Sequence, residues 1–366
     1  MSARPLRVLH LLNTVRETGN GIINTAIDLA WGQAQRGHEV HLASGGGEFE
    51  SRLAWWGITH HALDQRRGPV TLLRAAARLR ALLGRLRPDV VHAHMMTGAV
   101  LARAVRSGPP PRGPLLVGHV HNVYQRSARL MALADIVLCC GTAVRATMRA
   151  RGVPDEKLRV VLNGTVGSPR LPDAATVVPA ALSHPAVVTV AGMNARKGID
   201  ELLQAFGTIA AAHPGAHLYL VGDGPERARF ESAARAMDAR TGAALSRVHF
   251  VGFQRDPMPY LRAADVFVLA SRRESFPIVI GEARAAGCAI VATDVDGVRE
   301  SLDDGHAGVL VPARDPAALA AAIDSLLSDP VRRATQAAAG REGLAHYQVQ
   351  RMVDETVAVY RTSLAC

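Results

Sequence analysis

The chain has 366 residues, of which 48% are hydrophobic and 20% are charged, and this length and composition favour two folded domains and exclude a disordered chain. Its 42 basic and 32 acidic side chains give a formal net charge of +10, but with 4% aromatic residues and no nucleic-acid-binding motif we expect no nucleic acid partner. The sequence shows no signal-peptide pattern and no apolar run near the roughly 18 residues of a membrane span, so we expect a cytoplasmic protein.

In chain order, the first part of the sequence alternates short β-type runs with helical patterns. The expected strands are 7–12, 38–43, 89–94, 114–121, 135–140 and 159–163, and the expected helices are 22–35 and 72–86. This alternation predicts βαβ units, and therefore a parallel sheet covered by helices.

The helix expected at 72–86 is unusually basic. Residues 1–170 carry 23 basic and 10 acidic side chains, whereas 171–366 carry 19 and 22. Along the helix, Arg74, Arg78 and Arg85 share one side, and Leu79 and Leu83 fall largely on another. Two interpretations stay open: a solvated basic face on a helix that covers the sheet, or peripheral contact with an anionic membrane.

A second series follows a Pro- and Ala-rich stretch at 171–185, which we interpret as a linker. Its expected strands are 186–192, 217–224, 248–253, 264–271, 288–293 and 308–312, with helices at 199–211 and 225–237 and another beginning at Pro277. We therefore predict an α/β protein with two Rossmann-like, doubly wound parallel-sheet domains facing a central cleft, spanning 1–170 and 186–345. An amphipathic terminal helix within 346–366 is expected to pack across the domain junction. Ligands of such sheets bind at the carboxyl ends of the strands.

The segment RRESFPIVIGEARAAG, residues 272–287, suggests an anion site. Pro277 suits the first position of a helix, which leaves Glu274 in the preceding loop and places Glu282 inside the helix. The backbone N–H groups of Ile278 and Val279 then belong to the first turn, where the helix dipole favours an anion. A phosphate is the ligand that this arrangement predicts.

The segment GMNARKG, residues 192–198, follows a strand and precedes a helix in the same domain. Arg196 and Lys197 at that position suit a diphosphate, since arginine offers a planar fork and lysine a point charge. The alternative is a solvated loop with ordinary charges.

Two other patterns in the second domain are weaker. VGDGPER, residues 221–227, resembles the start of a dinucleotide-binding fingerprint, but Arg227 stands where the third glycine belongs, so a tight turn is the preferred interpretation. Asp294 and Asp296 resemble a metal-binding DxD pair, but they follow a strand and precede Gly297, which favours a turn with capping carboxylates.

Two HxH pairs, His92 with His94 and His119 with His121, each place two imidazoles on one face of a strand. A metal site would require further convergent ligands, which the sequence does not indicate, so we expect no metal. His121, at the end of its strand, is the best candidate for a group in the cleft. Gly21, between the first strand and the first helix, would allow the backbone to approach a ligand closely; a simple connecting turn is the alternative.

Taken together, SRRESFPIVIGEARAAG, GMNARKG, HLYLVGDGPE, ADVFVLAS and, in the first half, RPDVVHAH, HVHNVY and VVLNGT resemble the retaining glycosyltransferases of family GT4, which have the GT-B fold. The similarity extends over essentially the whole chain. It implies a bacterial enzyme with an acceptor-side N-terminal domain and a C-terminal domain that binds the nucleotide sugar.

The resemblance also implies roles for individual residues. Glu282 would hold the ribose hydroxyls of the nucleotide, Glu274 would lie near the donor sugar, and His121 would lie beside the reaction centre. The diphosphate would be held by backbone amides following Phe276 and by basic side chains, with Gly21 approaching from the other domain; the donor-binding residues are thus Gly21, Arg196, Lys197, Phe276, Pro277, Ile278, Val279 and Glu282. Three positions depart from the family pattern, namely Asn20, Met193 and Ser275.

We therefore expect a metal-independent, retaining transferase that needs no cofactor and moves a sugar from a nucleotide sugar, preferably UDP-linked, to a hydroxyl of a sugar, a lipid-linked or a small-molecule acceptor. Polysaccharide, glycolipid and natural-product glycoside synthesis all fit. Two alternatives remain open: a nucleotide-sugar epimerase of the same fold, and a non-catalytic subunit that binds sugar nucleotides. If the basic helix contacts a membrane, the enzyme would work peripherally at the inner face of the cell membrane.

Overall fold

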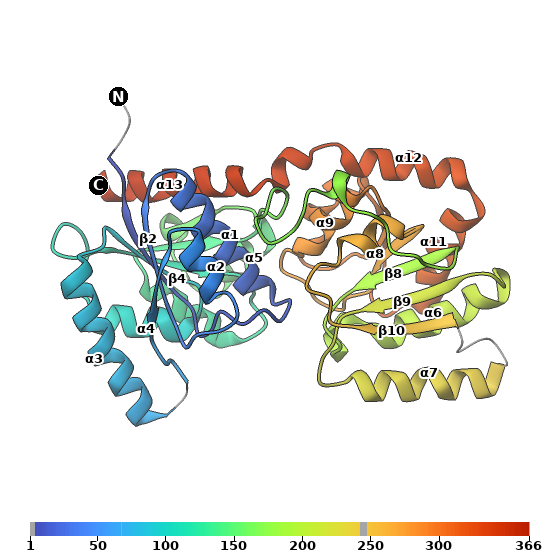
Figure 1. Ribbon diagram of the computed structural model, residues 1–366, viewed down its shortest axis with the longest axis horizontal. Coiled ribbons are helices and arrows are strands. Elements are labelled where there is room, and N and C mark those ends of the chain that lie inside the picture. The colour runs from blue at the N-terminus through green and yellow to red at the C-terminus, as the bar shows by residue number, and fades with distance from the viewer. Residues whose placement is uncertain (1–3, 67, 242–246, 366) are drawn as a thin grey trace. The chain divides into compact units, whose positions relative to one another are not determined.

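The computed structural model describes residues 4–66, 68–241 and 247–365. The chain forms two compact units: the first comprises Met1–Thr165 with Tyr347–Cys366, and the second Val166–His346. Each unit contains one parallel β-sheet flanked by helices (Figure 1), which confirms the predicted α/β class with two Rossmann-like sheets.

The first unit has a seven-stranded sheet in the order β3-β2-β1-β4-β5-β6-β7. Its strands are β1 Arg7–Leu11, β2 Glu39–Ser44, β3 Thr59–Ala62, β4 Val90–Ala93, β5 Leu115–Val120, β6 Ile136–Cys139 and β7 Leu158–Val160. The central strands are buried almost throughout, as apolar runs covered on both faces should be. Strands β1, β4 and β5 lie side by side, so the loops that follow them start at one edge of the sheet.

Six α-helices accompany this sheet in the part of the unit that the structure describes. They are α1 Gly21–Gln35, α2 Glu50–Trp55, α3 Pro69–Leu86, α4 Met96–Val105, α5 Thr142–Ala150 and α13 Val349–Ala365. The terminal helix α13 packs on β5 and on α1, which lies beside it in Figure 1. Val349, Met352, Val353 and Tyr360 of α13 are fully buried in a core shared with β1, β4 and β5. The contacts of α13 thus assign it to the first unit, although residues 161–348 separate it from β7.

The second unit has a six-stranded parallel sheet in the order β10-β9-β8-β11-β12-β13. Its strands are β8 Ala186–Val190, β9 His217–Val221, β10 Val248–Gly252, β11 Val266–Leu269, β12 Ala289–Thr293 and β13 Val309–Val311. Its helices are α6 Ile199–Ala212, α7 Arg227–Thr241, α8 Met258–Ala263, α9 Ile278–Ala286, α10 Val298–Ser301, α11 Pro316–Ser328 and α12 Pro330–Arg341. One core lies under α6 and α11, and a second lies under α8 and α9.

The stretch expected as a linker, 171–185, packs on the second unit. Leu171, Ala174 and Val177 lie against the core beneath α9, and Leu182 lies against β8 and β9. The boundary between the units accordingly lies at Thr165, earlier than the expected residue 170. No helix in the described part of the chain is both long and apolar enough to cross a bilayer.

Candidate functional site

The basic segment 192–198 and the segment 272–287, which contains Glu274, lie close together in the second unit because the strands that precede them are neighbours. Strands β8 and β11 run parallel with Val187 opposite Val266, so the loops that follow them leave the same edge of the sheet. The Arg272 N–H donates to the carbonyl of Arg196 at 2.8 Å and ties the loops together. The approach requires glycine at 198, where φ is +65° and a Cβ would lie 1.9 Å from the Ala270 carbonyl oxygen.

Glu274 is the centre of this arrangement. The Lys197 ammonium donates to Glu274 Oε1, the Ser271 hydroxyl donates to the same oxygen at 2.8 Å, and Arg196 Nη1 lies 3.5 Å from it. Glu274 is buried, so the ion pair is shielded from solvent. An ammonium has three N–H donors, so Lys197 retains donors for a second anionic partner beyond Glu274.

Helix α9 begins directly after this loop. It starts at Ile278, one residue later than expected, with Pro277 in an extended conformation at the cap position. The amides of Ile278 and Val279 lie in its first turn, where backbone N–H groups have no acceptor within the helix. Phe276 is buried beside this turn, and Glu282 is buried in the interior of the helix. The structure therefore brings together Arg196, Lys197 and Glu274 and attaches the α9 terminus to the same loop.

Two carboxylates that the sequence analysis did not assign to this site hold its loops. Glu226 Oε1 accepts from the Ala195 N–H at 2.6 Å, and Asp296 Oδ2 accepts from the Glu274 N–H at 3.2 Å. Glu226 lies in the VGDGPER segment that follows β9, and Asp296 follows β12. Both could have been placed near the site from the sequence, because each lies in a segment that follows a strand adjacent to β8 or β11. Asp294 pairs with Arg299, so the two aspartates have separate partners.

The departures from the family pattern have distinct structural settings. Met193 is fully buried in the core beneath α6, a position that suits an apolar side chain and not a charged arginine. Asn20 caps α1, its side-chain oxygen accepting from the Ile22 N–H at 2.9 Å. Ser275 is buried. Gly21 is the first residue of α1 and, like His121, belongs to the first unit.

His121 lies directly after β5 within a cluster of five buried histidines. The cluster comprises His10, His92, His94, His119 and His121. The register places His10 opposite His92, and neighbouring rings stack, with the centroids of His119 and His121 4.0 Å apart. Two triads, His10–His92–His94 and His94–His119–His121, bring ring nitrogens within 4.8 Å of one another. The expectation that nothing would converge on the HxH pairs is wrong, because β4 and β5 are adjacent strands and β1 adds His10.

Burial governs the protonation of this cluster. It lowers the pKa of His10 to about 4 and that of His121 to about 3. The pKa values of His92, His94 and His119 are also lowered well below the usual value, by burial first and then by their neighbouring histidines. The rings are therefore neutral at pH 7.

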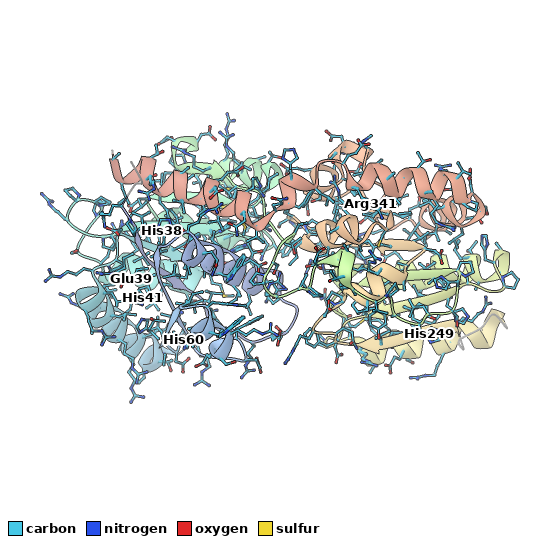
Figure 2. The ribbon with its side chains drawn as sticks, turned by 45° about the horizontal axis from the view of Figure 1, so that its top comes forward. His38, Glu39, His41, His60, His249 and Arg341 are labelled. Atoms are coloured by element: carbon cyan, nitrogen blue, oxygen red, sulfur yellow. The ribbon has the colours of Figure 1, made fainter. Side chains whose placement is uncertain are left out.

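A second group of histidines, at the β2–β3 edge of the same sheet, is built differently. Figure 2 labels His41, His60 and Glu39 of this group. His41 Nε2 lies 3.0 Å from Glu39 Oε1, and His60 Nδ1 lies 3.3 Å from Glu50 Oε2. Each of these two histidines has a carboxylate partner, whereas ring nitrogens of the buried cluster contact other histidines, a glutamine and a tyrosine.

Both halves of the chain match family models. Residues 19–165 match a model described as Glycosyltransferase Family 4, and residues 184–329 match one described as Glycosyl transferases group 1. A phosphatidyl-myo-inositol mannosyltransferase of Mycobacterium leprae is 35% identical over 170 residues, which is 46% of this chain and 43% of that protein. The match thus spans less than half the length of this relative.

Longer matches extend over most of the chain. A glycogen synthase of Mycobacterium tuberculosis is 28% identical over 336 residues, covering 84% of this chain and 75% of the synthase. The crystal structure of HepE from Anabaena in complex with UDP and glucose superimposes with a TM-score of 0.82 at 19% identity, covering 98% of this chain and 100% of HepE. At that identity the superposition shows a shared fold.

Proposed function

Because this chain belongs to glycosyltransferase family 4 and has the GT-B fold, we propose that it transfers a sugar from a nucleotide diphosphate sugar, preferably a UDP-sugar, to a hydroxyl acceptor. The observation that carries the proposal is the group formed by Arg196, Lys197 and Glu274 beside the N-terminus of α9. Guanidinium, ammonium and helix amides together stabilise the charge that develops on a leaving diphosphate.

The preference for UDP and the acceptor class rest on the relatives. HepE was crystallised with UDP and glucose, which supports a UDP-sugar donor. The mannosyltransferase that matches 46% of this chain takes its name from a phosphatidylinositol, which supports a lipid-linked hydroxyl acceptor. Sugars and small molecules that carry a hydroxyl group are the alternative acceptors. If the basic face of α3 contacts a membrane, the enzyme would act peripherally at the inner face of the cell membrane.

The reaction would proceed with retention and without a metal or other cofactor. The nucleophilic hydroxyl would attack from the face that the diphosphate leaves, and a diphosphate oxygen would take its proton. Arg196, Lys197 and the α9 amides would neutralise the charge that a divalent cation neutralises in other sugar transferases. Transfer that persists in excess EDTA and yields the donor's anomeric configuration supports this mechanism; loss of transfer that manganese restores contradicts it.

Product analysis tests the activity itself. A thermal-shift screen of UDP-, GDP- and ADP-sugars identifies the donor, since a ligand that binds the folded state raises the melting temperature. With that donor, a transferase gives a glycosylated acceptor and free nucleoside diphosphate. An altered nucleotide sugar formed without acceptor would identify an epimerase, and binding without turnover would identify a non-catalytic subunit.

The role of Glu282 is tested by nucleotide affinity. Replacing Glu282 by Ala removes charge-assisted hydrogen bonds to a ribose diol, which cost on the order of 1.5–3 kcal/mol to lose, so the Kd for UDP should rise tenfold or more. Glu342→Ala, at an exposed glutamate of the same unit, is the matched control and should leave the Kd unchanged. Unchanged affinity in a folded Glu282→Ala variant contradicts the assignment.

A further inference from the structure

Three histidines of the buried cluster and one glutamine form a continuous chain of polar contacts. Gln33 Oε1, on α1, lies 2.8 Å from His10 Nε2. His10 Nδ1 lies 2.9 Å from His94 Nε2, and His94 Nδ1 lies 3.1 Å from His121 Nε2. All four residues are buried. The contacts lead from α1, through β1 and the residue that follows β4, to the residue that follows β5.

The chain of contacts has a direction. Each ring is neutral at pH 7, and a neutral imidazole carries one N–H and one lone pair. The amide oxygen of Gln33 can only accept, so His10 donates from Nε2 and its Nδ1 is the acceptor. His94 must then donate from Nε2 to His10 and accept at Nδ1, which requires that His121 donates from Nε2.

We propose that Gln33, His10 and His94 are positioning residues that hold the His121 ring in one orientation and in the Nε2–H tautomer, leaving Nδ1 unprotonated. The catalytic consequence rests on the proposed function and on the place beside the donor sugar that the family resemblance implies for His121. A fixed lone pair accepts a hydrogen bond from a hydroxyl and repels a phosphate oxygen. The arrangement therefore favours a sugar hydroxyl, and not the diphosphate, as the group that His121 contacts.

The surroundings of His121 Nδ1 fit the Nε2–H tautomer. His121 Nδ1 is buried and has no hydrogen-bond partner among the described residues. A buried acceptor without a partner is found more often than a buried N–H without one, so the tautomer with bare Nδ1 is the less costly of the two. The neighbouring Cys140 thiol donates to the carbonyl of His121 at 3.4 Å, which holds the backbone of the same residue.

Proton positions can be measured directly, without substrate. In protein labelled with ¹⁵N at histidine, the two ring nitrogens of His121, assigned with a His121→Asn variant, should show an Nε2–H signal and an unprotonated Nδ1 throughout pH 6–8. In His94→Phe, which removes the acceptor, this preference should give way to a mixture of tautomers. An Nδ1–H signal in the wild type, or an unaltered His121 spectrum in His94→Phe, overturns the proposal.

The same spectra distinguish a metal site. One equivalent of Zn²⁺ should leave the signals of His94 and His121 unchanged, because both nitrogens of His94 and Nε2 of His121 are already hydrogen-bonded, and His121 Nδ1 alone is too few ligands for a metal site. A stoichiometric shift of both signals would mean that the cluster binds metal, and it overturns the proposal.

Kinetics test the consequence for catalysis. With UDP-glucose, or another donor that the wild type turns over, His94→Phe should lower kcat about tenfold or more with KM within about twofold, because orientation affects the reacting geometry more than binding. His94→Gln should recover much of the rate, since its amide can both donate to His10 and accept from His121. The control is His119→Phe, which replaces a stacked ring that has no hydrogen-bond partner among the described residues, and it should keep near-wild-type kcat.

The outcomes separate this proposal from the proposed function. If the tautomer is as stated but His121→Ala leaves kcat unchanged, the positioning holds and the role of His121 in transfer is wrong. If His121→Ala abolishes transfer while His94→Phe and His119→Phe behave alike, the positioning chain is wrong and the proposed function stands.

Discussion

Lys197 is placed so that one positive charge can serve two anions. Its ammonium donates to the buried Glu274 carboxylate, which also accepts from Ser271. In an unliganded protein this pairing neutralises a half-buried lysine, and the two remaining N–H donors stay available for phosphate oxygens. Arg196, which lies 3.5 Å from the same carboxylate oxygen, adds a second cation on one short loop.

We expect Lys197→Ala and Arg196→Ala each to raise the Kd for UDP about tenfold, with little change in the Kd for uridine, because each removes a charge-assisted contact to phosphate. The double variant should lose less than the sum of the two effects, since both cations would act on one diphosphate. Calorimetric titration measures both ligands. Arg235→Ala, at an exposed arginine of α7, is the control; equal losses for uridine and UDP would show that the loop holds no phosphate.

The buried histidines make stability depend on pH. Unfolded histidine titrates near pH 6.5, whereas burial holds the pKa of His10 at about 4 and that of His121 at about 3. Below pH 6.5 the unfolded state therefore binds more protons, and the free energy of unfolding should fall as pH drops toward 4, by up to about 1.4 kcal/mol per pH unit for each histidine. Urea unfolding at pH 7, 6 and 5 measures the slope.

Two variants test whether the buried histidines cause this dependence of stability on pH. His119→Phe removes one buried histidine without breaking a hydrogen bond between described residues, so its stability should fall less steeply with acid. His346→Ala, at an exposed position, should keep the wild-type slope. A wild type equally stable at pH 7 and pH 5 contradicts the assigned protonation states.

For single residues, the sequence predicted which side chains form the candidate site better than it predicted which of them contact each other. Arg196, Lys197 and Glu274 were expected at one edge of a sheet, and the adjacency of β8 and β11 brings them there. The direct pairing of Lys197 with Glu274 was not expected, because it depends on how two loops fold over Gly198. His10 was missed because its neighbours are set by strand order, which alternation along a chain does not reveal.

Among the elements, α3 carries a surface of mixed character. Ala75, Leu79, Leu82 and Leu83 are buried against the first unit. On the exposed side, Arg74, Arg78 and Arg85 lie on the same helix as Val70 and Leu73, which are 57% and 71% exposed. The sequence predicted the basic face, but it did not predict that Val70 and Leu73 would be exposed on the same helix. Exposed leucine and valine beside arginine are the composition of a helix that rests on a membrane surface.

We expect the protein to co-sediment with vesicles that contain anionic lipid, and to dissociate as salt rises, because each arginine near the surface contributes roughly 1 kcal/mol that ions screen. Replacing Arg74, Arg78 and Arg85 by Ser should abolish binding at physiological salt, and Leu73→Ser should weaken it. A triple Arg→Ser variant at Arg103, Arg149 and Arg159, elsewhere on the first unit, is the control. Wild type that ignores anionic vesicles at low salt shows that the face of α3 is merely solvated.

Element boundaries were predicted less well than element types. Helix α9 begins at Ile278 and not at Pro277, because the extended conformation of Pro277 makes it the cap. Residues 171–185, rich in Pro and Ala, contain no strand in the structure, as expected, yet they pack on the second unit through Leu171, Val177 and Leu182. A loose pattern in sequence predicts irregular backbone, but it does not predict exposure.

Over the whole molecule, the first unit is completed by the last helix of the chain. Amphipathicity predicted that residues 346–366 form a helix that must bury one face, but it could not indicate which core receives that face. The structure shows Met352 and Val353 in the core beneath β1, β4 and β5. Gly32 of α1 lies so near that a Cβ there would be 2.4 Å from Val353 Cγ2.

We expect Met352→Ala to lower the stability of the first unit by about 2–5 kcal/mol, the usual cost of truncating a buried methionine. Hydrogen exchange followed by mass spectrometry should show faster exchange in β1, β4 and β5 and unchanged exchange in β8, β11 and β12. Glu355→Ala, at an exposed position of the same helix, should change neither set. Equal acceleration in both units would show that they unfold together.

The late position of α13 bears on synthesis at the ribosome. When β7 has emerged, the first sheet still lacks the helix that covers Leu6, Val8 and Leu115, and it must wait while residues 166–346 are translated. At about 5–20 residues per second this wait lasts on the order of ten seconds or more. During that time the nascent first unit exposes an apolar face, whereas the second unit can fold as soon as it is made. The core of the first unit can therefore be completed only after the whole of the second unit has been synthesised, although the first unit is begun earlier.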